Sequence, residues 1–246
     1  MDRFYSMDRF YCPPERIHTP LLRLPPEETH HVMHVLRYRP GDRIEVTDGR
    51  GGVYTVRLRN LRGLEIEGEI EEAVYDPDEV GYELTLVVGV IKHPDRQAWL
   101  VEKATELGVR RIAWIRTSRT ERDQIRLDRL QRIAIAALKQ SGRRWLPELL
   151  PPRALTDWLQ QDKARWRLAA HGPGAPYPPI SSLLPRPLPK GATISVLIGP
   201  EGGFADQELE LLRAHGLALC SLGPYRLRTE TAAVAAAAAL LWAAAG

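Results

Sequence analysis

The chain has 246 residues and a net charge of +3, and its 44% hydrophobic and 26% charged residues are typical of a globular protein with one large domain or two smaller ones. Its two cysteines, Cys12 and Cys220, are too few for a disulfide framework, and no stretch near Met1 has the pattern of a secretory signal. The most apolar run, residues 232–246, is shorter than the roughly 20 residues that a membrane span requires, so we expect a cytoplasmic protein without a membrane segment.

The start of the chain predicts a small β-barrel. It repeats itself as MDRFYSMDRFYC, so we interpret residues 1–6 as an upstream start or an added segment and leave them out of the fold argument. The stretch DRIEVTDGRGGVYTVRLRNL alternates apolar and polar residues on both sides of Asp48-Gly49. This alternation around a glycine turn is the pattern of a β-hairpin.

One short helix is expected on this barrel. Val32, Val35 and Leu36 recur at helical spacing ahead of Pro40-Gly41. The polar, turn-rich stretch YDPDEVGYE then marks a boundary. We therefore expect one domain at residues 1–75 and a second at residues 82–246.

After the boundary, strands alternate with longer helices. Continuous apolar runs predict buried strands, and amphipathic runs predict the helices between them. The expected strands are residues 82–91, 111–117, 165–172, 192–200 and 217–223, and the expected helices are residues 94–109, 127–143, 206–216 and 229–245. Such alternation is typical of an α/β fold in which helices cover both faces of a parallel sheet.

Positive charge is concentrated in the middle of the chain. Residues 1–75 carry 11 basic and 13 acidic side chains, whereas residues 92–153 carry 15 basic and 7 acidic ones. Only five of the 34 basic residues are lysine, and arginine binds phosphate through paired hydrogen bonds and stacks on bases. This pattern favours a nucleic-acid partner. The alternative is a solvated face, with an arginine excess that reflects genome composition or a warm habitat.

Three predicted strands end in glycine-marked turns, which read HGPGA after Ala170, GPEGG after Ile198 and LGPYRL after Cys220. Ligands of parallel α/β sheets bind outside the carboxyl ends of the strands. Glycine lets a ligand lie against main-chain N–H and C=O groups, and Gly202 and Gly203 can adopt positive φ. A ligand-cradling turn is one interpretation of LIGPEGGF, and a tight turn needed only for packing is the other.

Several other sites are not supported. Neither G-x-G-x-x-G nor G-x-x-x-x-G-K-[ST] is present, so no pyrophosphate cradle is expected. His30 and His34 share a helix face with His31 beside them, but no carboxylate or cysteine set completes a metal site, and a helix surface packed on the barrel is favoured. Cys220 lies within an apolar strand, where a buried structural thiol is the usual role.

Five ordered motifs carry a resemblance that extends from about Arg9 to Leu241. They are HHVMHVLRYRPGD at 30–42, VEKATELGV at 101–109, QSGR at 140–143, IGPEGGF at 198–204 and LRTETA at 227–232. Together they resemble the RsmE family, the bacterial 16S rRNA uridine-N3 methyltransferases of the SPOUT superfamily. The resemblance implies a PUA-like β-barrel followed by a SPOUT domain whose last helix is threaded into a trefoil knot. It also implies S-adenosylmethionine bound in the knot, a homodimer and 16S rRNA as the partner.

The resemblance implies that main-chain N–H and C=O groups of the three turns bind the cofactor, which has no phosphate and needs no phosphate-binding loop. The residues expected to bind it are Ile198, Gly199, Glu201, Gly202, Gly203, Leu222, Gly223, Leu227 and Thr231. We interpret Glu201 either as an electrostatic partner of the cationic ligand or a nearby arginine, or as a carboxylate that fixes the turn by accepting N–H bonds, and we favour the second. The residues expected to contact RNA are Arg9, Arg37, Arg119, Arg122 and Arg126.

Two residues are candidates for the chemistry. The N3–H group of uridine is a weak acid and must lose its proton as N3 attacks the methyl group. Arg228 is expected to stabilise the charge that develops on O2 or O4. Glu230 is a candidate base, or else a carboxylate that complements the dipole of the last helix. Because base pairing hides N3, the uridine must be unpaired or extruded.

The chain departs from the family pattern at two places. Where the family often has L-G-x-R-I-L-R, residues 222–228 read LGPYRLR, so Tyr225 replaces an arginine and Arg226 an apolar residue. The Ser or Thr that often follows GPEGGF is Ala205, which weakens the helix cap unless Asp206 takes it over.

Two other functions remain open at this point. One is an RNA-binding ribosome-assembly factor that keeps the fold without turnover, and binding of S-adenosylmethionine separates it from the enzyme. The other is a small-molecule enzyme on a doubly wound sheet. The arginine-rich middle segment and the additional barrel argue against a small-molecule enzyme.

Overall fold

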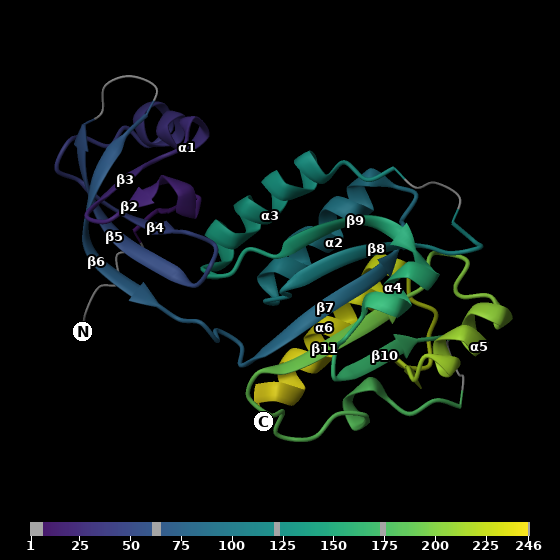
Figure 1. The fold of residues 1–246 in the computed structure, drawn as a ribbon. Coiled ribbons are helices and arrows are strands. Elements are labelled where there is room, and N and C mark those ends of the chain that lie inside the picture. The colour runs from purple at the N-terminus through teal and green to yellow at the C-terminus, as the bar shows by residue number, and fades with distance from the viewer. Residues whose placement is uncertain (1–6, 61–64, 121–123, 173–175, 246) are drawn as a thin grey trace. The chain divides into compact units, whose positions relative to one another are not determined.

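The computed structural model describes residues 7–60, 65–120, 124–172 and 176–245. The backbone divides into two compact units, Met1–Glu79 with Leu138–Leu146, and Val80–Ala137 with Pro147–Gly246 (Figure 1). Each unit has its own sheet and its own buried core. The segment Leu138–Leu146 groups with the first unit although the sequence pattern assigns it to the second domain.

The first unit contains a six-stranded sheet in the order β1-β4-β5-β6-β3-β2. Its elements are β1 (Arg9–Tyr11), a 3-10 turn (Pro14–Arg16), β2 (Ile17–His18), β3 (Leu21–Arg23), α1 (Pro26–His30), a π-helical turn (His31–Val35), β4 (Arg43–Thr47), β5 (Gly52–Asn60) and β6 (Glu67–Tyr75). The predicted hairpin is confirmed, because β4 and β5 pair antiparallel. In its turn, the Asp48 carboxylate accepts hydrogen bonds from the N–H groups of Arg50 and Gly52.

The core of the first unit draws on both edges of this strand order. Phe10 of β1, Ile44 of β4 and Val56 of β5 are completely buried in one cluster. Ile17 of β2, at the opposite edge, packs against the same cluster. A sheet whose two edge strands share one core must curl around it, which is the geometry of a small barrel.

The short helix differs from the one expected. α1 begins at Pro26, and the chain then forms a π-helical turn in which the Leu36 N–H bonds to the carbonyl of His31 at 3.0 Å. A π turn changes the phase of the residues that follow it relative to a regular helix. Val32 is therefore buried, whereas Val35 and Leu36 are 59% and 38% exposed.

The second unit is built on a parallel sheet in the order β12-β10-β11-β7-β8-β9. Its strands are β7 (Tyr82–Gly89), β8 (Arg111–Arg116), β9 (Glu148–Ala154), β10 (Trp166–Ala170), β11 (Ala192–Ile198) and β12 (Ala218–Cys220). Its helices are α2 (Pro94–Glu106), α3 (Leu127–Ser141), whose last turn belongs to the first unit, α4 (Leu155–Gln161), a 3-10 turn (Ile180–Ser182), α5 (Asp206–Ala214) and α6 (Thr229–Ala245). Every strand and helix predicted after residue 82 is confirmed, as is the α/β class. The trefoil knot stays a prediction.

Helices cover both faces of this sheet (Figure 1). Val87, Ala113 and Leu197 point to one face, where they share a buried cluster with Trp158 of α4 and Leu212 of α5. Their neighbours along each strand point to the other face. On that side α6 packs against α2, β7 and β11.

Among the described residues of the second unit, the strand β9 and the helix α4 were not predicted. β9 reads ELLPPRA, and its Pro151 and Pro152 cannot donate hydrogen bonds to a neighbouring strand. Proline is tolerated on an edge strand or at a bulge. β9 is the last strand in the sheet order, and its pairing with β8 is irregular between Ala113 and Ile115. The helix that follows, α4, covers the sheet through Trp158.

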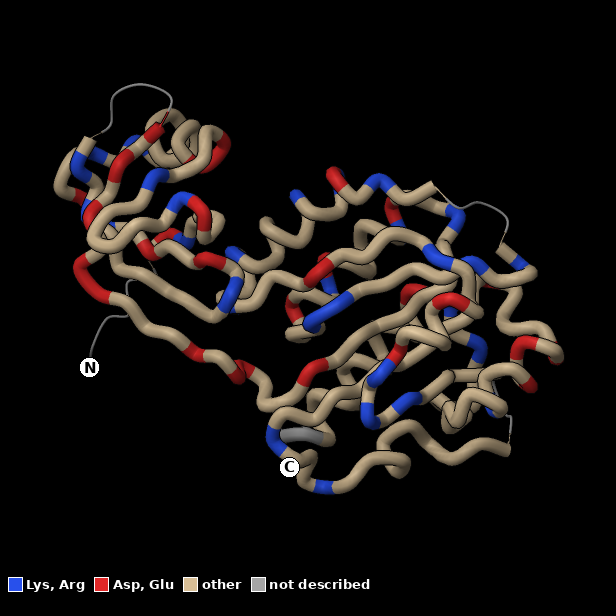
Figure 2. Tube along the Cα trace, viewed as in Figure 1, with Lys and Arg blue, Asp and Glu red and all other residues tan. Residues whose placement is uncertain are grey.

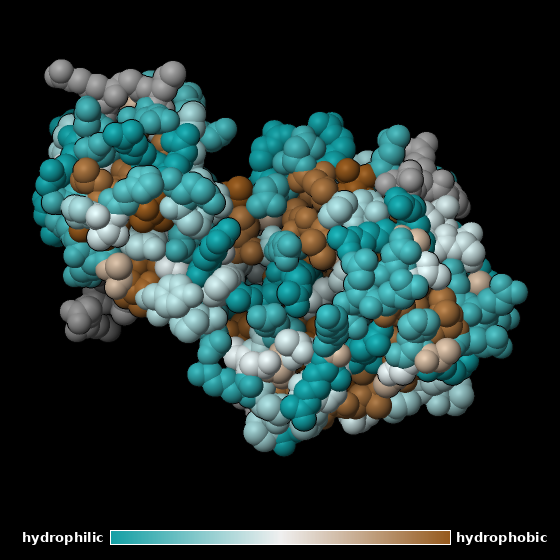
Figure 3. Space-filling view, in the orientation of Figure 1, coloured by the Kyte–Doolittle hydropathy of each residue, from teal (hydrophilic) through white to brown (hydrophobic). Residues whose placement is uncertain are grey.

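Within the described ranges, no helix combines the length and the apolar character needed to cross a membrane. On the face that Figure 3 presents, hydrophilic side chains dominate and smaller hydrophobic patches lie between them. Both cysteines are buried, and burial raises the pKa of the Cys220 thiol to about 12. This thiol therefore stays protonated and has the structural role that its apolar strand predicts.

Candidate active site

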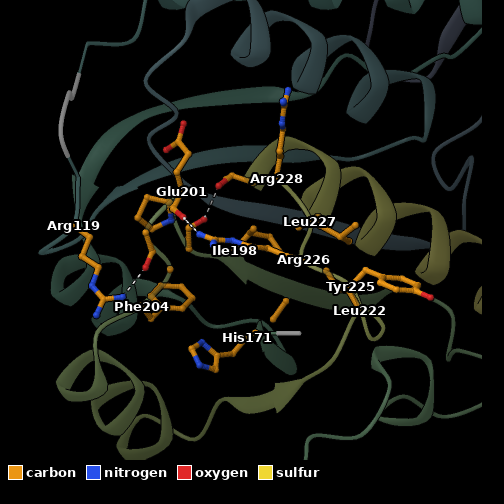
Figure 4. A pocket seen from close by; sticks show the side chains of 18 of the residues that line it. Arg119, His171, Ile198, Glu201, Phe204, Leu222, Tyr225, Arg226, Leu227 and Arg228 are labelled. Carbon is orange, nitrogen blue, oxygen red and sulfur yellow. Dashed lines mark hydrogen bonds between the residues drawn. The ribbon is translucent and has the colours of Figure 1, made fainter. Parts of the chain in front are cut away.

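The carboxyl ends of three neighbouring strands meet at one edge of the second sheet. Ala170 of β10 pairs with Ile198 of β11 on one side and with Cys220 of β12 on the other. The segments that follow these strands therefore begin side by side, although only His171 and Gly172 of the predicted HGPGA turn lie within the described residues. They surround a pocket of about 560 Å³, which Arg119 and the first turn of α6 also line (Figure 4).

The pocket brings together most of the residues predicted to bind a cofactor. Those that line it are Ile198, Gly199, Glu201, Gly202, Gly203, Leu222, Gly223 and Leu227. Thr231 is exposed on α6 and is not among the residues that line the pocket, so its contact with the cofactor stays a prediction. Thr229 lies at the pocket instead, and its hydroxyl donates a hydrogen bond to the carbonyl of Gly199 at 3.1 Å.

The turn after β11 is a close-packed main-chain structure. The Gly203 N–H donates to the carbonyl of Pro200 at 2.7 Å, and Gly203 has a φ of 69° that favours glycine. A Cβ on Gly199 would lie 3.1 Å from main-chain atoms of Gly203 and Phe204. A residue missed by the sequence analysis is Gly89 at the end of β7, where a Cβ would lie only 2.3 Å from the Pro200 nitrogen. The turn therefore excludes side chains both within itself and on the strand beside it.

Polar groups from other loops hold this turn in place. The Glu201 carboxylate accepts a hydrogen bond from the Lys92 N–H at 3.3 Å, in agreement with its interpretation as a turn-fixing group. Nη1 of Arg119 donates to the carbonyl of Gly202 at 2.6 Å. Nη2 of Arg226 lies 3.5 Å from the carbonyl of Glu201. Charged side chains thus fix the turn through hydrogen bonds to main-chain groups.

The helix that follows the turn lacks the usual hydroxyl cap. Glu208 compensates for it, because its carboxylate accepts the N–H of Ala205 at 2.8 Å and the N–H of Ser118 at 2.7 Å. This is half of a capping box. The compensating residue is therefore Glu208, whereas Asp206 was the one considered from the sequence.

The side chain of Arg228 is exposed at the rim of the pocket. Figure 4 shows it extending away from His171 and Phe204. No hydrogen bond or ion pair joins its guanidinium to another residue in the described part of the chain. This group is therefore available to a ligand or substrate.

Glu230 has a different environment, although only one residue separates it from Arg228. It is 5% exposed and does not line the pocket. Its Oε1 lies 3.6 Å from Nε of Arg96 on α2, while Oε2 has no hydrogen-bond partner among the described residues. This placement favours a structural role between α2 and α6 over the role of a base.

His171 at the end of β10 also lines the pocket, and the sequence analysis did not single it out. Burial lowers its pKa from the ordinary value, and the nearby guanidinium of Arg213 lowers it further. The imidazole is therefore mainly neutral at pH 7. Among the residues that the structure describes, no three His, Cys, Asp or Glu side chains are grouped to hold a metal ion.

The predicted RNA contacts differ in their surroundings. Arg9 has protein partners, because its Nε bonds to the Glu45 carboxylate and its Nη1 donates to the carbonyl of Arg143 at 3.2 Å, and its contact with RNA stays a prediction. Arg37 and Arg126 are exposed, and Arg119 lines the pocket. Arg122 lies outside the described residues.

Two family models match this chain. One, described as an RNA methyltransferase domain, matches residues 78–241, and the other, described as an RNA methyltransferase PUA domain, matches residues 24–71. The ribosomal RNA small subunit methyltransferase E of Synechocystis is 30% identical over 96% of this chain and 77% of its own length.

Solved structures resemble both units together. The ribosomal RNA small subunit methyltransferase E from Neisseria gonorrhoeae, bound to S-adenosylmethionine, has a TM-score of 0.80 and 32% identity, covering 95% of this chain and 96% of that one. A Legionella pneumophila protein solved in complex with the same cofactor has a TM-score of 0.81 and 30% identity, with the same coverage of 95% and 96%. Because these matches extend over both units and include the predicted motifs, the chain belongs to the RsmE family of RNA methyltransferases.

Proposed function

We propose that this protein transfers a methyl group from S-adenosylmethionine to N3 of a uridine in 16S ribosomal RNA, as a cytoplasmic homodimer. The observation that carries the proposal is the pocket at the ends of three strands. Glycines form part of its lining, and the Arg228 guanidinium lies unpaired at its rim. Family membership supports the reaction class, and the names of the relatives support ribosomal RNA as the substrate.

The pocket fits S-adenosylmethionine in size and in chemistry. Its volume of about 560 Å³ is within the range of small-molecule sites. Ile198, Leu222 and Leu227 provide apolar surface for an adenine ring. Gly199 and Gly203 line the pocket without side chains, so that the ribose and the amino acid of the cofactor can approach the main chain. When bound, the cofactor supplies an electrophilic methyl group on a sulfonium.

The residues of this chain would act on the RNA base. The Arg228 guanidinium donates hydrogen bonds to a uracil carbonyl and stabilises the negative charge that develops as N3 loses its proton. We assign no proton transfer to Glu230, because its buried carboxylate lies beside Arg96 and is not among the groups that line the pocket. Solvent is therefore the proposed acceptor.

Cofactor binding tests this proposal directly. Calorimetry should show binding of S-adenosylmethionine with micromolar affinity, and a concentration 100 times the Kd should stabilise the fold by about 2.7 kcal/mol. ATP is the matched control, because it offers the same adenosine with a triphosphate that this pocket has no motif to hold. Absence of S-adenosylmethionine binding, or equal binding of ATP, would contradict the assignment. Mass mapping of 16S rRNA from a deletion strain then identifies the nucleotide.

The proposed homodimer has a candidate interface on α2 and α6, which pack against each other. Trp242 of α6 is 76% exposed and Trp99 of α2 is 41% exposed. Exposed large aromatic side chains on neighbouring helices are typical of a protein interface.

Light scattering of the wild type should give the mass of two chains, and Trp242→Glu should give the mass of one chain. Val74→Glu, at another exposed site, is the control and should leave the dimer intact. A monomeric wild type at micromolar concentration would contradict this interface.

A further inference from the structure

The first unit has an unusual exposed turn at residues 35–39, which read VLRYR. Arg37 has a φ of 59°, and it is the one non-glycine residue with positive φ among those described. The turn follows the π-helical segment, and its main chain is ordered, because the N–H groups of Leu36 and Tyr38 bond to the carbonyls of His31 and Val32. A left-handed conformation at a residue other than glycine, and a π turn, both cost free energy and are found preferentially at functional sites.

The side chains that this backbone presents do not stabilise the core. Val35 and Leu36 are 59% and 38% exposed, and Arg37 and Arg39 are also exposed. Tyr38 is different, because its hydroxyl bonds to the carboxylate of Asp8 at 2.9 Å and anchors the turn. The strained turn therefore directs two apolar and two cationic side chains into solvent.

Charge pairing distinguishes this turn from the sheet of the same unit. Arginines in the strands pair with carboxylates, in the ion pairs Arg23–Glu67, Arg43–Glu71, Arg57–Glu71 and Arg59–Glu69, and Arg16 of the 3-10 turn pairs with Glu65. Figure 2 shows the resulting mixture of blue and red along these strands. By contrast, the guanidinium groups of Arg37 and Arg39 have no hydrogen bond or ion pair with any residue in the described ranges. They are free to bind an external anion.

We propose that residues 35–39 form an RNA-binding turn, in which Arg37 and Arg39 bind backbone phosphates while Val35 and Leu36 lie against a ribose or a base. Two unpaired guanidinium groups beside a small apolar surface match the alternation of phosphate and base along an RNA chain. The neutralised sheet face does not offer this combination. The identity of the RNA rests on the proposed function.

The backbone conformation provides a clean substitution. Glycine accepts positive φ without strain, so Arg37→Gly should keep or raise the melting temperature while it removes the guanidinium. We expect Arg37→Gly with Arg39→Ala to weaken binding of a 16S rRNA transcript by roughly tenfold, and to reduce the slope of log K against log salt by about 0.7 to 0.9 for each lost phosphate contact. Leu36→Ser should weaken binding without changing that slope. Arg57→Ala removes the same charge from the sheet face, and its affinity should stay within about twofold of the wild type because Arg57 is paired with Glu71.

The outcomes separate this proposal from the proposed function. If the wild type methylates RNA and the 37/39 variant binds the transcript as well as the wild type, the turn is not a binding surface. Equal losses in the 37/39 variant and Arg57→Ala would also overturn the proposal, because they would show a nonspecific charge effect. A change in the sedimentation coefficient of Leu36→Ser would assign the turn to a protein contact instead.

If the 37/39 variant loses RNA affinity while the wild type methylates nothing, the turn is supported and the proposed reaction fails. A wild type that binds no RNA overturns both.

Discussion

Replacing Arg228 with alanine should lower the rate of methyl transfer by roughly a hundredfold or more and leave the affinity for S-adenosylmethionine almost unchanged. The reason is the isolation of this guanidinium at the pocket rim, where no described residue pairs with it. It is therefore not needed to hold the loops together. Its contribution should appear only as charge develops on the uracil. Single-turnover methylation and calorimetry on the same variant measure the two quantities separately.

The neighbouring Arg226 supplies the control for this experiment. Its Nη2 lies 3.5 Å from the carbonyl of Glu201, so Arg226→Ala should mainly loosen the turn and weaken cofactor binding. Arg228→Lys should recover part of the lost rate, because a cation returns without the paired donors of a guanidinium. If Arg228→Ala lowers cofactor affinity and melting temperature together, the residue is structural. Full activity in that variant would remove Arg228 from the mechanism.

Gly89→Ala should have the largest effect on cofactor binding, with a loss of affinity of roughly a hundredfold. An added Cβ would lie 2.3 Å from the Pro200 nitrogen and 2.6 Å from its Cδ. Neither atom can move without shifting the main chain of the turn after β11, and we expect a cost of about 1–3 kcal/mol in stability. The shift also displaces the wall that Gly199 and Gly203 form. Calorimetry with S-adenosylmethionine and thermal unfolding check the two effects.

Gly68→Ala is the matched control for this overlap. A Cβ on Gly68 would also lie 2.3 Å from a neighbour, in this case Cγ1 of Val56 in the first unit. This variant should lose stability without losing cofactor affinity. If Gly89→Ala binds the cofactor like the wild type, the turn adapts to the extra atom, and the wall at residues 199–203 is not the binding surface.

The sequence by itself determined five of the six strands in the sheet of the second unit and the glycine-marked turns that follow three of them. Periods of two and 3.6 residues are local properties, so the alternation of apolar strands with amphipathic helices after Tyr82 predicted each element that it covered. A parallel sheet places the carboxyl ends Ala170, Ile198 and Cys220 at one edge, but the strand order β12-β10-β11 that makes them neighbours came from the tertiary structure. The hairpin around Asp48 was predictable because its turn residues are adjacent in the chain.

Only the tertiary structure decided which side chains near the pocket are available for chemistry. Glu230 forms an ion pair with Arg96, and Arg9 forms one with Glu45. Each pair joins segments that are distant in the sequence. Thr229, and not Thr231, lies at the pocket, because the phase of α6 points the Thr229 hydroxyl at the carbonyl of Gly199. Such assignments depend on strand register and helix phase, and a shift of one or two residues reverses them without altering the local hydrophobic pattern.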